Sequence, residues 1–184
     1  MTELASKEQL RGSLLRWALV LVPLVLLLGI LSGRLAGSGA DNPWFAALTK
    51  PALYPPPALF GVVWTVLYLL MGLAASLVAA ARGAAMRGPA LAAFAVQLIL
   101  NLCWSPLFFA AHQIFAALVL MIVLDIAVIA TIVLFGKVRP AAALLLIPYL
   151  AWVLFATLLT WEFHAANPGA DGREVSGAVT RVQI

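Results

Sequence analysis

The side chains in this sequence that could bind a ligand are mainly tryptophans and tyrosines, accompanied by a few amides and hydroxyls. Gln97, Asn101, Trp104 and Ser105 recur at steps of three to four residues within one apolar run, so they share one face of a helix. Apolar walls with a few orienting polar groups are the usual composition of a small-molecule pocket. This face therefore indicates a binding site for an apolar small molecule.

Two further stripes also combine aromatic rings with a few small or polar residues. One carries Phe60, Trp64, Tyr68, Met71 and Gly72, and the other carries Tyr149, Trp152, Ala156 and Thr160. Polar side chains in a membrane helix usually face the interior of the bundle, so the three stripes could converge on one cavity. The alternative is that the amides only join helices and the aromatic rings only pack or anchor. Periodicity alone leaves both interpretations open.

Asp125 is the one carboxylate near the middle of an apolar run. Its position favours a role with a ligand or a proton, or else a hydrogen bond to a neighbouring helix. His112 and His164 lack partners at metal-ligand spacing, and neither a phosphate-binding glycine loop nor a nucleophile elbow is present. We therefore expect no metal and no required cofactor, in a binding or transport protein rather than an enzyme.

The composition requires a bilayer around these helices. Hydrophobic residues make up 65% of the chain and charged residues 10%, whereas soluble domains carry about 25% charged residues. A helix crosses the hydrocarbon core with about 20 apolar residues, and five runs are long enough: 14–36, 59–81, 89–111, 114–136 and 141–163. We predict an all-α integral membrane protein, a bundle of five transmembrane helices over 14–163. Residues 1–13 form a basic flank, 37–58 a structured loop lid and 164–184 a polar mobile tail.

Lysine and arginine counts predict the orientation. The N-terminal side holds seven, Lys7, Arg11, Arg16, Arg82, Arg87, Lys137 and Arg139, and the other side holds four, Arg34, Lys50, Arg173 and Arg181. This bias predicts a cytoplasmic N-terminus in a bacterial cytoplasmic membrane, with an outer or organellar membrane as the alternative. The net charge of +4 matches such flanking anchors, and we expect no nucleic acid partner.

The first long loop, residues 37–58, is predicted to be stiff. "DNPWFAALTKP" has the signature of a short helix, with Asp41 or Asn42 as its cap and Pro43 at its first position. The prolines of "PALYPPP" then restrict the chain to extended conformations. We expect a lid over the helix ends that holds Trp44 and Tyr54 in fixed directions.

Small residues predict close helix packing. Gly29, Gly33 and Gly37 are spaced as a double GxxxG, and Gly72, Ser76 and Ala80 repeat that spacing, while Gly88, Ala92, Ala93 and Ala95 cluster in the third run. Such faces let helix backbones approach closely, within one chain or between chains.

These motifs together resemble the translocator protein family, also called tryptophan-rich sensory proteins or peripheral-type benzodiazepine receptors. The family pattern around the lid is matched by Trp44, Phe45, Leu48, Lys50, Pro51, Pro55, Pro56, Phe60, Trp64, Thr65, Leu67, Tyr68, Met71, Gly72 and Ala74. The pattern Q-L-x-x-N-x-x-W-[ST]-P-x-F-F is matched from Gln97 to Phe109, and P-Y-x-x-W by Pro148, Tyr149 and Trp152. The resemblance runs from about Trp44 to Asn167.

The resemblance implies a homodimeric five-helix bundle whose cavity, under the first loop, binds tetrapyrroles (porphyrin or haem) and benzodiazepine-type drugs. It implies these ligand-binding residues: Trp44, Tyr54, Phe60, Trp64, Tyr68, Gln97, Asn101, Trp104, Ser105, Tyr149, Trp152, Phe155 and Ala156. The alternatives are a light- and oxygen-dependent porphyrin-degrading enzyme, for which Trp44 and Trp152 are the candidate reactive residues, and a transporter of a lipophilic ligand.

The sequence departs from the family pattern in two places. Thr160 stands where an Asn is usual, which alters a polar contact. The sterol-recognition pattern of animal members is missing, because no Lys or Arg follows Tyr149 within five residues. Lys50 is the nearest candidate for binding the carboxylates of a porphyrin.

Overall fold

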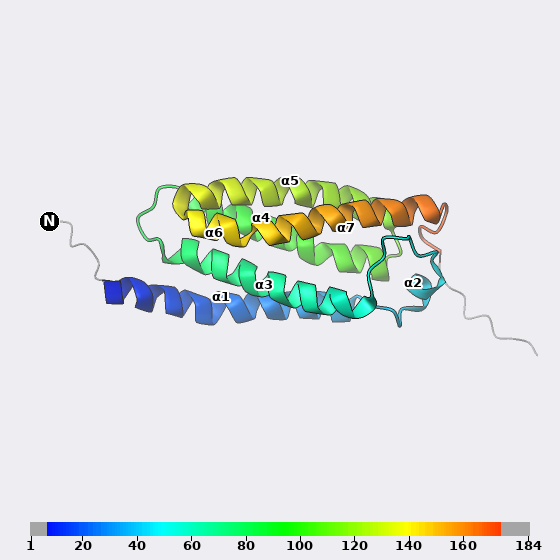
Figure 1. The fold of residues 1–184 in the computed structure, drawn as a ribbon, viewed down its shortest axis with the longest axis horizontal. Helices are drawn as coiled ribbons and strands as arrows, with labels where there is room; N and C mark the ends of the chain where they lie inside the picture. Colours follow the sequence, from blue (N-terminus) through cyan, green and yellow to red (C-terminus); the bar gives the residue numbers. More distant parts are fainter. Residues whose placement is uncertain (1–6, 174–184) are drawn as a thin grey trace, which may run out of the picture.

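The computed structural model describes residues 7–173, which form a bundle of long helices aligned with one axis (Figure 1). The elements are α1 (Lys7–Leu35), α2 (Pro43–Ala47), α3 (Pro57–Ala80), α4 (Arg87–Ser105), η1 (Pro106–Ala110), α5 (Ile114–Val138), α6 (Pro140–Leu145) and α7 (Ile147–Ala166). Five stretches are long and apolar enough to cross a membrane: Arg11–Leu35, Pro57–Ala80, Arg87–Ala110, Ile114–Val138 and Pro140–Ala166. The predicted all-α fold with five spans is confirmed.

The helix boundaries differ from the predicted ones at α1, α6 and α7. Helix α1 begins at Lys7, a turn or more before the apolar run, so part of the basic flank is helical. Helix α7 continues past Phe163 to Ala166. A separate short helix, α6, precedes it, because Pro148 has no N–H to continue the backbone ladder.

The third span ends in a π-helical turn, η1, that follows Ser105. Its wider winding is closed by the bond from the Ala111 N–H to the Pro106 carbonyl (2.9 Å). Single π turns inside helices are frequent at functional sites. Here the turn contains Phe108 and Phe109, and both rings are buried beneath the lid.

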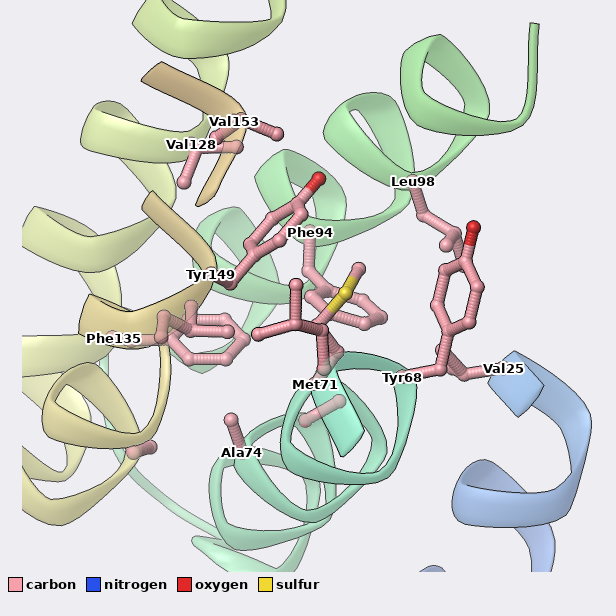
Figure 2. Close-up of a cluster of buried hydrophobic side chains, with 14 of the residues drawn as sticks. Val25, Tyr68, Met71, Ala74, Phe94, Leu98, Val128, Phe135, Tyr149 and Val153 are labelled. Carbon is pink, nitrogen blue, oxygen red and sulfur yellow. The ribbon is translucent and has the colours of Figure 1, made fainter. Parts of the chain in front are cut away.

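Helix α1 packs mainly on α3, while α5 packs on α4, α6 and α7. The α1–α3 contact is close because Gly72 has no side chain. A Cβ at this position would lie only 2.6 Å from the Val22 Cα. The core between the helices is centred on Met71, which is fully buried (Figure 2). Phe94 and Phe135 stack in the same cluster, with ring centroids 5.8 Å apart.

The loop lid is folded as the sequence predicts. Asn42 caps α2, since its side-chain oxygen accepts from the Phe45 N–H (2.9 Å), and Pro43 is the first helical residue. Figure 1 places α2 at the end of the bundle where α1 and α7 finish.

The start of the predicted polar tail is ordered. Asp171 accepts from the backbone N–H groups of Ile114 (2.6 Å) and Phe115 (3.2 Å), at the beginning of α5. A carboxylate at a helix N-terminus is favourable because it satisfies unpaired N–H groups. Residues 164–173 are therefore helix and packed loop, which corrects the predicted tail boundary. The remainder of that predicted tail, 174–184, lies outside the described residues.

Candidate functional site

A cavity of about 400 Å³ lies beneath the lid, between α1, α3, α4, η1, α5 and α7. Its size is in the range of small-molecule pockets, about 300–1,000 Å³. The predicted site residues that line it are Tyr54, Phe60, Trp64, Tyr68, Asn101, Trp104, Ser105, Trp152 and Ala156. Residues from each of the three predicted stripes thus line one cavity.

The walls of the cavity consist largely of aromatic rings in mutual contact. Trp64 stacks on Tyr68 with ring centroids 5.3 Å apart, and Trp104 stacks on Phe108 at 5.1 Å. Trp152 meets the edge of Phe60 at 5.8 Å. Such contacts hold the rings in place, so the apolar surface is already shaped before a ligand enters.

A buried hydrogen bond braces one side of the cavity. The Tyr68 hydroxyl on α3 donates to the Asn101 side-chain oxygen on α4 (3.0 Å), and both residues are buried and line the cavity. The Asn101 oxygen is therefore occupied, while its amide group also contacts the Tyr149 hydroxyl on α7. Asn101 consequently serves both as a link between helices and as a candidate ligand contact.

Four predicted site residues lie outside the cavity. Gln97 and Tyr149 share the stripes but lie deeper in the core, where the Tyr149 hydroxyl donates to the Gln97 oxygen (2.9 Å). Phe155 packs against the hydrophobic cluster under the lid without lining the cavity. Trp44 is buried behind Phe108, which it meets edge-on at 5.4 Å.

Trp44 fixes the lid to the segment that follows α7. Its indole N–H donates to the Ala170 carbonyl (3.3 Å), and its ring stacks on His112 at 4.7 Å. Beside it, Asn167 exchanges two bonds with the Thr49 backbone, at 2.8 and 3.0 Å. Trp44 therefore points in a definite direction, as predicted, but toward the C-terminal segment rather than into the cavity.

The other lid aromatic, Tyr54, does face the cavity. Its ring stacks on Phe60 at 5.6 Å and meets the edge of Phe163 at 5.8 Å. Desolvation raises the pKa of the Tyr54 hydroxyl above its ordinary value, so the group is a neutral donor and acceptor at the rim.

Lys50 serves the lid and not the cavity. Its ammonium group donates to the carbonyls of Phe45 and Leu48 (3.0 Å for Leu48) and lies 4.2 Å from the Phe45 ring centroid. These bonds satisfy carbonyls at the end of α2. Desolvation lowers the pKa of Lys50 from its ordinary value. Since Lys50 does not line the cavity, it is not positioned to hold a ligand carboxylate there.

Sequence reasoning missed the contribution of α1. Gly29, Gly33 and Arg34 line the cavity, and Arg34 is the one charged side chain among the described residues that do so. The GxxxG spacing marked the glycines as a packing face but did not place them at the site. Phe45 and Phe108 also line it, and both stand at family-pattern positions that were not assigned to the ligand.

Asp125 makes the hydrogen bond to a neighbouring helix that was one of its two predicted roles. It is buried between α5 and α7, where the Thr157 hydroxyl donates to its Oδ2 (2.8 Å), and it does not line the cavity. Thr160, the departure from the family pattern, lines the cavity with its hydroxyl turned back to the Ala156 carbonyl (2.7 Å). Within residues 7–173, no three His, Cys, Asp or Glu side chains gather in a way that could hold a metal.

These features define a class: a multi-pass integral membrane protein of five spans that encloses an aromatic cavity beneath a folded loop. The sequence matches the TspO/MBR family over residues 20–165. This chain therefore belongs to the TspO/MBR family.

Several relatives cover most of both sequences. The tryptophan-rich protein TspO of Archaeoglobus fulgidus is 44% identical over 124 residues, 67% of this chain and 80% of that protein. The human translocator protein is 38% identical over 147 residues, 79% and 87% of the two chains. Protein CrtK of Rhodobacter capsulatus is 36% identical over 142 residues, 75% and 85%.

Proposed function

We propose that this protein binds tetrapyrroles, such as protoporphyrin and haem, and hydrophobic drug-like molecules in the cavity under the lid. The observation that carries the proposal is a cavity of about 400 Å³ whose walls include the rings of Trp64, Trp104 and Trp152. Flat apolar ring systems gain favourable contacts against such surfaces. Membership of the translocator and tryptophan-rich sensory protein family supports the same ligand class.

Quenching of tryptophan fluorescence by protoporphyrin tests this proposal. We expect saturable quenching by the full-length protein in detergent. Trp152→Phe, in the cavity wall, should reduce the quenching and the affinity. Trp161→Phe is the matched control, because Trp161 lies on the same helix but is exposed on the outside of the bundle. Folded protein without quenching at high porphyrin concentration would contradict the proposal.

Light- and oxygen-dependent porphyrin degradation is a second candidate, supported by the position of Trp152 against the cavity. Trp44, the other candidate reactive residue, does not line the cavity and packs against Phe108, which does. Turnover would appear as loss of bound porphyrin absorbance in light under oxygen, with none in the dark. Trp152→Phe should then abolish the loss, whereas Trp44→Phe should leave it.

The proposed homodimer needs a face that is not used within the chain. Gly29 and Gly72 are occupied in the contact between α1 and α3. The small residues of α4 differ, since Gly88, Ala92 and Ala95 are exposed on one face, together with Cys103 further along the helix. Small exposed residues let two helices approach closely. Oxidative cross-linking in membranes should yield a dimer that Cys103→Ser abolishes, and its absence would remove this face as the interface.

We further propose that the N-terminus is cytoplasmic, in a bacterial cytoplasmic membrane, from the excess of Lys and Arg on the N-terminal side. Reporter fusions at the two ends test it. A fusion active only in the periplasm should be silent at the N-terminus and active at the C-terminus, and the opposite pattern would reverse the assignment.

A further inference from the structure

Arg34 is the one charged side chain among the described residues that line the cavity. It occupies the last turn of α1, where the helix dipole favours a cation. Its guanidinium makes no hydrogen bond to another residue within 7–173, and the side chain is exposed. A cation at the rim of an otherwise neutral, aromatic cavity can pair with a charge that enters with a ligand.

Two donors in the cavity walls lack a partner. The indole N–H groups of Trp104 and Trp152 are buried without a hydrogen bond to another described residue. The Asn101 oxygen is already bonded to Tyr68, and the Thr160 hydroxyl donates to the Ala156 carbonyl of its own helix. A ligand with acceptor atoms can satisfy the two indole N–H groups.

We infer that the cavity selects ligands with a flat aromatic body and a carboxylate, and that the carboxylate pairs with Arg34 at the rim. Guanidinium and carboxylate groups match in two parallel hydrogen bonds, which gives this pair its strength and its direction. The aromatic walls hold the body of the ligand, and Arg34 determines which end stays at the rim. The inference names the ligand class of the proposed function and rests on it.

A comparison of an acid with its neutral ester isolates this contact. Protoporphyrin IX and its dimethyl ester share one ring system and differ in the two carboxylates. We expect full-length protein in neutral detergent to prefer the acid. Arg34→Gln should weaken acid binding about tenfold, a change of about 1.4 kcal/mol, and leave ester binding unchanged. Arg34→Lys should recover part of the preference, because it restores the charge but not the two-bond geometry.

The matched control is Arg82→Gln. Arg82 is exposed in the loop between α3 and α4, at the opposite end of the bundle from the lid, so its loss changes the net charge equally without touching the cavity. Equal effects of the two substitutions would show that only the overall charge attracts the acid, and would overturn the role of Arg34.

A second probe separates failure of this subsite from failure of porphyrin binding. Pyrenebutyric acid and its methyl ester offer a smaller aromatic body with and without a carboxylate. If porphyrins do not bind but pyrenebutyric acid shows a preference that depends on Arg34, the proposed function fails and the subsite stands. If porphyrins bind but neither acid is preferred over its ester, the subsite fails and the proposed function stands.

Anionic lipid is the other source of acceptor oxygens for Arg34. Nanodiscs with and without phosphatidylglycerol distinguish it from a ligand. If Arg34→Gln lowers the melting temperature only in the anionic nanodiscs and leaves the acid preference intact, Arg34 is a lipid anchor and the inference is wrong.

Discussion

The hydrogen bond between Tyr68 and Asn101 allows the structural and ligand-binding roles of one residue to be measured separately. Asn101→Leu removes the acceptor of the Tyr68 hydroxyl, which is buried on α3. An unpaired buried polar group costs about 1–3 kcal/mol, whereas replacing both partners by apolar groups can be nearly neutral. We therefore expect Asn101→Leu to lower the free energy of unfolding and Tyr68→Phe to restore most of the loss.

The expected coupling energy between Tyr68 and Asn101 follows from the position of their hydrogen bond between two membrane helices. Hydrogen bonds between membrane helices give coupling energies that average about 0.6 kcal/mol and reach about 1.7 kcal/mol. The Tyr68–Asn101 bond is 3.0 Å long between two buried residues, so we expect a coupling in the upper part of this range. Unfolding in mixed detergent micelles, measured on the wild type, both single variants and the double variant, gives the value.

Ligand affinity separates the second role. If the Asn101 amide donates to the ligand, the double variant regains stability but does not regain porphyrin affinity. Thr157→Val is the control, because the Thr157 hydroxyl makes a bond to Asp125 between α5 and α7, away from the cavity; it should lower stability and leave affinity intact. Wild-type affinity in the Asn101→Leu variant would refute a ligand role for Asn101 and reduce it to a link between helices.

Three other changes test the packing around the site. Gly72→Ala should destabilise the protein by about 1–3 kcal/mol relative to Gly61→Ala in thermal unfolding, because a Cβ at Gly72 meets the backbone of α1 whereas one at Gly61 meets nothing within 4 Å; equal melting temperatures would contradict the close approach. Ala156→Thr should lower porphyrin affinity, since Ala156 lines the cavity, and unchanged titrations would contradict this. Asn167→Ala removes both bonds to the lid, so stopped-flow quenching should show faster ligand entry and release, and unchanged rates would show that the lid is held elsewhere.

Those features of the fold that depend on local chemistry could be predicted from the sequence. The five spans follow from the length of the apolar runs, and the start of α2 follows from the cap at Asn42 and the proline after it. The π turn after Ser105 and the break before α7 were not foreseen. Proline at position 106 or 148 is compatible with a kink, a break or a wider turn, and the choice depends on the helices packed beside it.

The helical repeat predicted which residues share a helix face, but not how far along that face each residue lies from the lid. Gln97 and Asn101 lie one turn apart on the same stripe, yet Asn101 lines the cavity and Gln97 is bonded to Tyr149 in the core. Both are buried amides with a tyrosine partner on a neighbouring helix. What distinguishes them is how close each lies to the lid, which depends on the relative positions of whole helices and is not contained in a period of 3.6 residues.

The part of the site that α1 supplies was harder still to foresee, because its effect depends on side chains that are missing. A Cβ at Gly29 would lie 2.1 Å from the Tyr68 ring, so this glycine lets α1 close tightly on α3. One turn later, a Cβ at Gly33 would meet nothing nearer than the Ser38 hydroxyl at 4.0 Å, and that space belongs to the cavity. The two glycines look alike in sequence, yet Gly29 allows a tight contact between two helices, whereas Gly33 leaves open space in the cavity. A larger side chain at position 33 would project into the cavity, so the same glycine keeps that part of the cavity open.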